Sequence, residues 1–355
     1  MDLDRYHRQM LLPGVGEEGQ RRLLASHAML VGCGALGCVI ADHLVRAGVG
    51  TITIVDRDVV ELTNLQRQML YDERDATEGL PKAEAARRRL VRINSSIAIH
   101  AVVADMAPDI AEAILRAPSP SLLVDGTDNF ETRYLLNDLA VKHNLPFVYG
   151  GAVGTRGMQL TVIPGRTPCL RCVFPEPPQP GSTPTCDTAG VLAPAVGIVA
   201  ACQATDAIKL MLGRADLIEP TLLEFDLWTT RRRRIDLSGH PRGGDCPCCG
   251  RRDFAYLDGR HASAAVMLCG RGATQIAPAA GANGQIVDLR ALASRLSPHG
   301  TFGVTEYLLR GTLERERTPG GEAVSLTVFP DGRAIIRGAP TPEAARTIYA
   351  RYVGV

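Results

Sequence analysis

A glycine-rich segment between an apolar strand and an apolar helix is the feature that most constrains the fold. Gly32, Gly34 and Gly37 have the spacing G-x-G-x-x-G, after an expected strand over 28–32 and before an expected helix over 36–47. Glycines at this spacing let the backbone turn tightly and approach a phosphate at the positive end of the helix. The segment predicts a nucleotide-binding α/β fold, with a purely structural turn as the alternative.

Strands and helices are expected to alternate through the first two thirds of the chain. A helical segment over 5–27 precedes the first strand, and Pro81 opens a further helix. This alternation is typical of a doubly wound, Rossmann-like and mostly parallel sheet. The other strands are expected over 51–55, 97–103, 121–125, 147–149 and 159–163.

Two domains are expected in the 355 residues. Residues 1–255 form the nucleotide-binding domain, and 174–190 in it contain too much proline for a helix or strand interior, so they form a long crossover loop. Residues 260–355 form a small α+β module. In the module we expect strands at 266–268 and 274–276, a helix over 288–296, a hairpin over 325–336 and a helix capped by Thr341.

Several polar side chains follow the second expected strand. Asp56 stands at its end, the usual place for an acid that binds a ribose, although this alone does not separate NAD from ATP. Asp58, Asn64, Arg67 and Gln68 come next. They form either an ordinary polar loop or a cationic, amide-rich wall around a nucleotide, since arginine binds phosphate oxygens through two N–H groups.

Two further candidates lie at other element ends. Lys82, at a helix start, adds a cation, although a lone lysine there is ordinarily solvated. Asp128 and Asn129 follow the buried strand 121–125, at the carboxyl end where such sheets bind ligands. Asp128 is suited to Mg²⁺, which takes a carboxylate together with phosphate oxygens. A helix N-cap is its alternative and compatible role.

Four cysteines have the spacing of a structural zinc site. Cys169 and Cys172 form one Cys-x-x-Cys pair, and Cys246 and Cys249 form another, with Cys248 as the spare thiol. Four thiolates at this spacing fit a closed tetrahedral site that pins two distant segments together, with a redox pair as the alternative.

The remaining cysteines have other expected places. Cys186, at the end of the proline-rich loop, is either a nucleophile or a small loop residue. Cys33, Cys38 and Cys202 are expected in the core, and Cys269 is ambiguous. Ten cysteines behind an N-terminus without a signal peptide's apolar segment indicate a reducing compartment, and hence the cytoplasm.

Charge and hydropathy exclude several classes of partner. A net charge of +1 gives no overall case for nucleic acid or an anionic membrane. The most apolar stretch, 191–212, contains Asp206 and Lys209 and therefore predicts a soluble helix. The run from Arg231 to Arg234 predicts a solvated edge strand, with a docking patch for an acidic protein and then one for nucleic acid as the alternatives.

Together these residues resemble the ThiF/MoeB family of ubiquitin-activating-type adenylyltransferases, which activate sulfur-carrier proteins. The resemblance runs from Arg5 to about Asp253 and departs at Ala35, where the family often has a second consecutive glycine. It rests on Arg5-Tyr6-His7-Arg8-Gln9, the glycine turn, the residues from Asp56 to Gln68, Lys82, Gly126-Thr127-Asp128-Asn129, Cys186 and the two cysteine pairs.

The resemblance implies a reaction between Mg·ATP and a small ubiquitin-fold carrier protein. The carrier's C-terminal Gly-Gly carboxylate would attack the α-phosphorus, giving an acyl adenylate and pyrophosphate. Implied roles are ribose binding for Asp56, neutralisation of the triphosphate for Asn64, Arg67 and Lys82, Mg²⁺ binding for Asp128, and contact with the partner subunit's ATP for Arg8. The last role implies a homodimer.

Cys186 matches the loop cysteine of the family. There it accepts the acyl group or takes part in a persulfide route to a thiocarboxylate, which implies a sulfur donor such as a cysteine desulfurase or a rhodanese. Activation for protein conjugation or peptide modification is the alternative within the family. An NAD-dependent oxidoreductase and a non-catalytic scaffold are alternatives outside it.

Overall fold

The computed structural model describes residues 3–116, 118–178, 186–240, 243–260, 265–268, 273–276, 286–318 and 320–354. The chain divides into two compact units, Met1–Ala262 and Ser263–Val355. Within the described residues, none of the helices has both the length and the hydrophobicity that crossing a bilayer requires.

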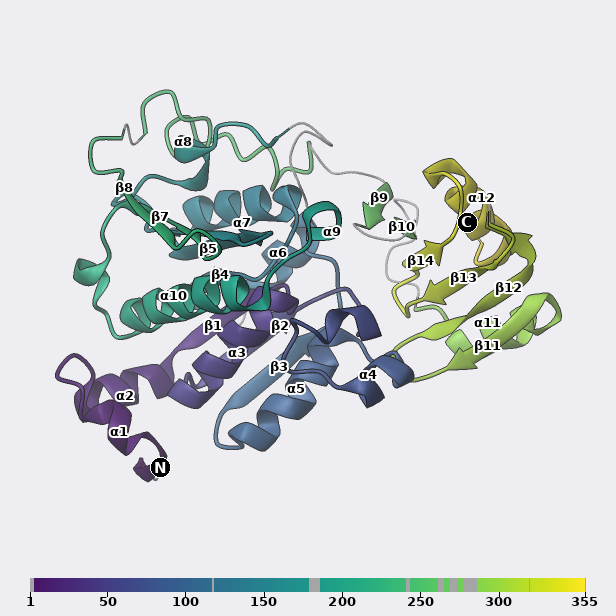
Figure 1. Cartoon of the computed structure of the whole chain (residues 1–355), viewed down its shortest axis with the longest axis horizontal. Coiled ribbons are helices and arrows are strands. Elements are labelled where there is room, and N and C mark those ends of the chain that lie inside the picture. The colour runs from purple at the N-terminus through teal and green to yellow at the C-terminus, as the bar shows by residue number, and fades with distance from the viewer. Residues whose placement is uncertain are drawn as a thin grey trace. The chain divides into compact units, whose positions relative to one another are not determined.

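An eight-stranded sheet forms the centre of the first unit, with strand order β3-β2-β1-β4-β5-β6-β7-β8 (Figure 1). Its first five strands are parallel: β3 (Ala98–Val102), β2 (Thr51–Val55), β1 (His27–Val31), β4 (Leu122–Asp125) and β5 (Phe147–Val153). The last three continue antiparallel: β6 (Arg156–Val162), β7 (Thr221–Asp226) and β8 (Arg231–Asp236). The expected doubly wound, mostly parallel sheet is confirmed, and β7 is an addition that the sequence did not predict.

Helices cover both faces of this sheet, as its alternating side chains require. Ala28 and Leu30 of β1 pack in one core, whereas Met29 and Val31 pack in the other. The first core lies under α3 (Ala35–Ala47), α5 (Lys82–Ile93) and α10 (Ala193–Met211), and the second under α6 (Pro108–Ile114) and α7 (Phe130–His143). Shorter helices are η2 (Leu62–Asn64), α4 (Glu73–Glu78), α8 (Leu170–Val173), α9 (Cys186–Ala189) and η3 (Ala215–Leu217).

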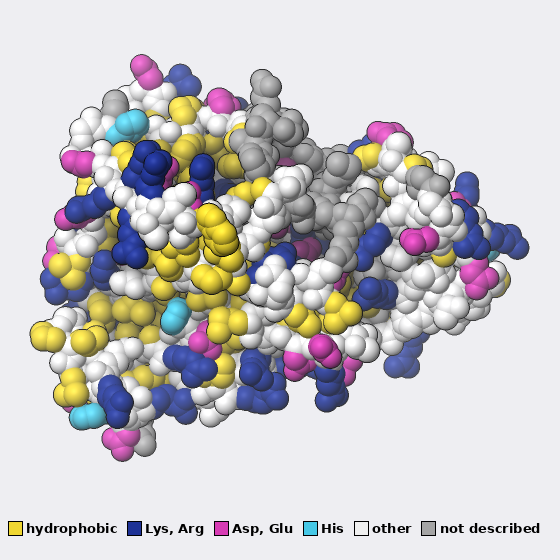
Figure 2. Space-filling model, viewed as in Figure 1, with side chains coloured by type: hydrophobic (Ala, Val, Ile, Leu, Met, Phe, Trp, Pro, Cys, Tyr) yellow, Lys and Arg dark blue, Asp and Glu magenta, His cyan; other side chains and the backbone are white. Residues whose placement is uncertain are grey.

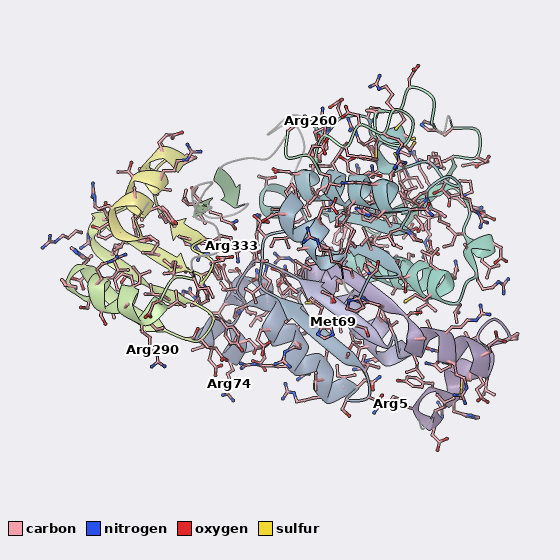
Figure 3. All side chains as sticks on the ribbon, turned by 180° about the vertical axis from the view of Figure 1, so that it is seen from behind. Arg5, Met69, Arg74, Arg260, Arg290 and Arg333 are labelled. Atoms are coloured by element: carbon pink, nitrogen blue, oxygen red, sulfur yellow. The ribbon has the colours of Figure 1, made fainter. Side chains whose placement is uncertain are left out.

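The N-terminal segment differs from the single helical stretch expected over 5–27. It contains η1 (Asp4–Tyr6), α1 (His7–Met10) and α2 (Gly16–Ala25). The break falls at Pro13-Gly14, because proline lacks an amide donor and glycine disfavours the helix interior. Arg5, labelled in Figure 3, donates to the carbonyl oxygen of Ile93 at 2.7 Å and so ties this segment to the end of α5.

The second unit contains a six-stranded antiparallel sheet of order β11-β12-β13-β14-β10-β9. The strands are β9 (Ala265–Leu268), β10 (Ala273–Ile276), β11 (Gly300–Val304), β12 (Leu309–Arg317), β13 (Ala323–Val328) and β14 (Ala334–Arg337). The helices are α11 (Leu289–Leu296), η4 (Ser297–His299) and α12 (Pro342–Tyr352). Thr341 Oγ1 accepts from Ala344 N at 3.2 Å, as its predicted cap role requires. The β13–β14 hairpin is confirmed, β11 and β12 were not predicted, and Cys269 lies outside the described residues.

Candidate active site

A cavity of about 1030 Å³ lies at one end of the strands of the large sheet. The carboxyl ends of β1, β2 and β4 all lie at this end, because the three strands run parallel. The glycine turn follows β1, Asp56 follows β2, and Asp128 follows β4, and all three line the cavity. Strand direction therefore gathers side chains from three distant segments.

The glycine turn packs tightly against the loop after β4. Gly32 has φ +85°, which favours glycine. A Cβ on Gly37 would lie 2.1 Å from the Gly32 carbonyl oxygen, and a Cβ on Gly126 would lie 2.2 Å from it. Gly32 and Gly34 line the cavity, whereas Gly37 packs behind them. The turn leaves the N-terminus of α3, with its positive end, beside the cavity.

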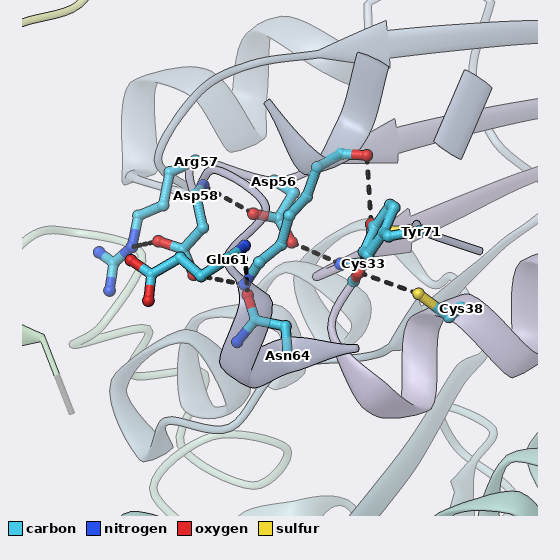
Figure 4. Close-up of polar contacts among 9 residues, drawn as sticks. Cys33, Cys38, Asp56, Arg57, Asp58, Glu61, Asn64 and Tyr71 are labelled. Atoms are coloured by element: carbon cyan, nitrogen blue, oxygen red, sulfur yellow. Dashed lines mark hydrogen bonds and ion pairs between the residues drawn. The ribbon is translucent and has the colours of Figure 1, made fainter. Parts of the chain in front are cut away.

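Asp56 braces this turn (Figure 4). Its Oδ2 accepts from Cys33 N at 2.6 Å and its Oδ1 from Asp58 N at 2.7 Å. Burial raises the pKa of Asp56, although the charge of Lys82 and the two amide donors oppose this shift. The sequence did not predict this structural role. Each oxygen accepts one hydrogen bond here and so keeps one further lone pair, and Asp56 lines the cavity.

Lys82 is buried at the cavity wall rather than solvated. Its side chain is 9% exposed, and its Nζ lies 3.0 Å from Asp58 Oδ2. Burial opposes its charge, but the carboxylates of Asp58 and Asp56 outweigh burial and raise its pKa. The expectation of a solvated lysine is wrong because the Lys82 amide donates to Asp58 O at 2.8 Å, which fixes the start of α5 against this loop.

Arg57 and Asp105 form a second ion pair at the cavity wall, beside Lys82 and Asp58, and the sequence analysis identified neither of them. Arg57 Nη1 lies 2.8 Å from Asp105 Oδ2, and both residues line the cavity. Burial opposes the charge of Arg57, but Asp105 and Asp58 raise its pKa. Asp105 follows β3 in the chain, so its place after a parallel strand was the available signal.

Asp128 is exposed at the cavity and does not cap the next helix. Asn129 is the N-cap of α7, and its Oδ1 accepts from Thr132 N at 2.9 Å. The N-cap alternative for Asp128 is therefore wrong. The one-residue offset leaves the Asp128 carboxylate at the cavity, as a ligand for a bound cation requires.

Arg133 holds the loop after β4 that contains Asp128, and the sequence analysis did not identify it. Its Nη2 donates to Thr127 O at 2.7 Å, and its Nε lies 3.3 Å from the buried Asp125 Oδ2. Its guanidinium carbon lies 5.5 Å from the ring centroids of both Phe130 and Tyr149. These contacts hold the loop after β4 in one position.

The other predicted residues divide into two groups. Arg67 and Gln68 line the cavity, and Arg67 Nη1 donates to Thr63 O at 3.0 Å. Asn64 and Arg8 are not among its lining residues. Asn64 Oδ1 instead accepts from Glu61 N at 3.1 Å in a capping box, and Arg8 is exposed on α1.

The two cysteine pairs meet as the spacing predicts. The sulfur atoms of Cys169, Cys172, Cys246 and Cys249 all lie within 4.8 Å of one another. Cys169 Sγ lies 3.8 Å from Cys172 Sγ and 3.7 Å from Cys246 Sγ. A tetrahedral zinc with Zn–S bonds of about 2.3 Å separates its sulfurs by about 3.8 Å, so the geometry fits this ion.

The other thiols lie elsewhere. Cys248 is buried and accepts from Asn137 Nδ2 at 3.3 Å, so it is the spare thiol as predicted. Cys33 and Cys38 are buried in the core, whereas Cys202 is only half-buried. Cys186 is the first residue of α9, and its side chain lies outside the described part of the structure.

The similarity to known proteins covers much more of the chain than the site residues. The sequence profile of the ThiF family matches residues 6–248. The sulfur carrier protein ThiS adenylyltransferase of Bacillus subtilis (strain 168) is 42% identical over 352 residues, which cover 99% of each chain. A sulfur carrier protein adenylyltransferase of Thermus thermophilus is 41% identical over 255 residues, which cover 70% of this chain and 91% of the relative. The first relative thus also matches most of the second unit.

Solved structures agree on the fold. The crystal structure of Escherichia coli MccB with ATP covers 70% of this chain and 75% of that chain, with a TM-score of 0.57 and 24% sequence identity. That identity supports a shared fold and no more. With the family profile spanning most of the first unit and a relative matching nearly the whole length, the chain belongs to the ThiF family.

Proposed function

We propose that this protein adenylates the C-terminal Gly-Gly carboxylate of a small ubiquitin-fold sulfur-carrier protein of the ThiS or MoaD type. One observation supports this function above all: the buried Lys82, the exposed Asp128 and the N-terminus of α3 line one cavity. The name of the 42% identical relative points to the same carrier class.

The chemistry needs positioning more than proton transfer. The carrier's carboxylate is already ionised, so it attacks the α-phosphorus of ATP without a general base. A bond forms between the carboxylate oxygen and phosphorus, and the bond to the bridging oxygen breaks, releasing pyrophosphate. The protein contributes charge neutralisation and alignment. Lys82, Arg67 and the positive end of α3 are suited to the triphosphate, and Asp56 to the ribose.

The donor set at the cavity fits magnesium. Mg²⁺ is typically bound through one or two carboxylates together with substrate phosphates. Asp128 presents such a carboxylate at the carboxyl end of β4, and its loop is held by Arg133. When bound, the ion would supply charge stabilisation to the triphosphate.

Zinc has a structural role in this proposal. The four thiols join the segment near 170 to the segment near 248, beside the core of the sheet that includes Cys169, Leu170 and Cys248. A closed four-sulfur site leaves no open coordination position, so it stabilises the fold and takes no part in the reaction.

Three further assignments belong to the proposal. Arg8, which is exposed on α1, reaches the ATP of a partner subunit, so the cytoplasmic enzyme acts as a homodimer. Asn64, at the edge of the Arg67 segment, joins the triphosphate wall once ATP is bound. Cys186 either accepts the acyl group from the adenylate, which releases AMP, or receives the outer sulfur of a persulfide carried by a cysteine desulfurase or rhodanese, whose own cysteine leaves as a thiol. Both routes lead to a thiocarboxylate.

ATP–pyrophosphate exchange in the presence of a ThiS-type carrier tests the function. Arg67→Ala and Asp128→Ala should abolish exchange, while Arg89→Ala, at an exposed position on α5, should retain it. Normal exchange in either site variant would contradict the assigned site. Absence of exchange in the unaltered protein with ThiS-type and MoaD-type carriers would contradict the function itself.

A further inference from the structure

One buried tyrosine joins two parts of the cavity wall and has no role in the reaction described above. Tyr71 is 7% exposed and packs in the same core as Cys33. Its hydroxyl group donates to Cys33 O at 2.6 Å and also lies 3.2 Å from Lys82 O (Figure 4). Cys33 belongs to the glycine turn after β1, and Lys82 is the first residue of α5. A single hydroxyl group therefore contacts the backbones of two distant segments that both line the cavity.

Side chains hold the peptide groups on both sides of Cys33. Cys33 N donates to Asp56 Oδ2 at 2.6 Å, which fixes the peptide group before it. Cys33 O accepts from Tyr71, and Cys38 Sγ lies 3.4 Å from the same oxygen. A thiol is only a weak donor, so the tyrosine makes the stronger bond. The orientation of the peptide group between Cys33 and Gly34 therefore depends mainly on Tyr71.

The direction of the Gly34 amide follows from this contact. In a trans peptide group the N–H and C=O bonds point in opposite directions, so Gly34 N–H points away from Tyr71. Gly34 lines the cavity, whereas Tyr71 does not. Among the described residues, Gly34 N donates to no acceptor. Gly34 is also the N-cap of α3, so its amide is placed to donate to a phosphate oxygen at the positive end of this helix.

The second contact of the hydroxyl group concerns the start of α5. Lys82 N donates to Asp58 O at 2.8 Å, and Lys82 O lies 3.2 Å from the Tyr71 hydroxyl oxygen. Figure 2 shows basic side chains gathered over α5, whose outer residues, such as Arg89, are exposed. Lys82 instead has a buried side chain at the cavity wall. Tyr71 thus contacts the carbonyl groups next to both phosphate-binding donors, the Gly34 amide and the Lys82 ammonium group.

We propose that Tyr71 is a positioning residue for the triphosphate of the bound nucleotide. Its hydroxyl group sets the spacing between the Gly34 amide and the Lys82 ammonium group, which approach the phosphate oxygens from different segments. This inference rests on the proposed function, because the triphosphate belongs to the substrate of that reaction. The ribose is assigned to Asp56, which accepts from two other backbone amides. Binding of the nucleoside part should therefore not depend on Tyr71.

Removal of the hydroxyl group alone tests this role. Tyr71→Phe keeps the ring in the core, and calorimetric titration measures the Kd of three probes: MgATP, tripolyphosphate and adenosine. The Kd of MgATP and that of tripolyphosphate should each rise about tenfold, because a misaligned amide loses a hydrogen bond to a charged oxygen. The Kd of adenosine should stay within about twofold. A tyrosine that only stabilised the fold would weaken the binding of all three probes alike, or of none.

The matched control is Tyr349→Phe in the second unit. Tyr349 donates from its hydroxyl group to Gly332 O at 2.8 Å, so this variant also removes a bond from a phenol group to a backbone carbonyl group. All three Kd values should stay unchanged in the control. Unchanged tripolyphosphate binding in Tyr71→Phe, an equal rise in the Kd of adenosine, or no tripolyphosphate binding to the unaltered protein would overturn the proposal. Thermal melting of both variants verifies that they are folded.

The kinetics of ATP–pyrophosphate exchange separate this inference from the proposed function. With the Bacillus subtilis ThiS protein as carrier, Tyr71→Phe should raise the KM for MgATP and for pyrophosphate about tenfold and leave the KM for the carrier within about twofold. A rise in the carrier KM equal to that for MgATP would overturn the positioning role. Tenfold weaker tripolyphosphate binding in Tyr71→Phe, together with no exchange in the unaltered protein with ThiS-type or MoaD-type carriers, would keep the positioning role and refute the proposed function.

Discussion

Gly37 and Gly34 lie three residues apart in one turn, yet alanine should have different consequences at the two positions. At Gly37 it should lower stability, and at Gly34 it should weaken nucleotide binding. A Cβ at Gly37 would stand 2.1 Å from the Gly32 oxygen and 2.9 Å from the Gly32 carbon. Both are backbone atoms of a turn held by the bond from Gly32 N to Val55 O at 2.8 Å, so no side-chain rotation relieves the clash. A Cβ at Gly34 meets only Gln68 Nε2, at an ordinary 3.7 Å.

The magnitude follows from two opposing effects at Gly37. Overpacking a rigid site costs about 1–3 kcal/mol or more, and a backbone clash this short lies at the upper end. Alanine inside α3 gains back about 1 kcal/mol over glycine. We therefore expect a net loss of about 2 kcal/mol, which lowers the melting temperature by roughly 4–8 °C for a unit of this size.

Gly34→Ala should instead affect nucleotide binding. Gly34 is the N-cap of α3, where alanine costs at most about 1 kcal/mol. Its new methyl group would face the cavity where the backbone approaches a phosphate, so the KM for ATP should rise about tenfold. Thermal melting and ATP–pyrophosphate exchange separate the two effects. A melting temperature of Gly37→Ala within about 1 °C of the unaltered protein, or a larger loss of stability in Gly34→Ala, would refute the steric argument.

Two further predictions concern the metal site and pH. Cys249→Ser should reduce zinc content to near zero and lower the melting temperature, whereas Cys248→Ala should retain zinc; elemental analysis and melting measure both, and zinc retained in Cys249→Ser would refute the site. The hydrogen bond from Arg87, followed by the one from Arg88, lowers the pKa of Glu84 from its ordinary 4.5. A lowered folded-state pKa gives stability that is complete above pH ~4.5 and is lost as the pH falls through the folded value. Glu84→Gln should therefore cost about 1 kcal/mol at pH 7 and almost nothing near pH 2, and a difference that stays constant between these pH values would contradict this origin.

Features that depend on residues close in the chain could be predicted from the sequence. The glycine turn, the strands on either side of it, and the Thr341 cap each depend on side chains within a few positions of one another. The four-cysteine cluster joins two segments far apart in the chain. It could still be predicted, since each Cys-x-x-Cys pair is local and two such pairs indicate one tetrahedral site. The extra strand β7 escaped prediction because a short run containing Glu224 and Asp226 has little alternation.

The candidate site could be predicted only in part. Asp56, Arg67 and Asp128 were identified and do line the cavity. Arg133 was missed because its partners, Asp125, Thr127 and Tyr149, come together only when β4 and β5 pair. The close contact of Gly126 with Gly32, in the turn after β1 and nearly a hundred residues earlier in the chain, also depends on the pairing of β1 with β4.

The sequence by itself determined the residue types, the periodicity of the strands and helices, and the family of chemistry that these permit. Only the tertiary structure decided that Lys82 is a buried partner of Asp58 rather than a solvated cation. It also decided that two arginines of the predicted edge strand β8, Arg231 and Arg233, line the cavity. The physical reason is the same in both cases. The burial and charge pairing of a side chain depend on which strand ends lie next to one another in the sheet. The order of the strands is set by packing between segments far apart in the chain.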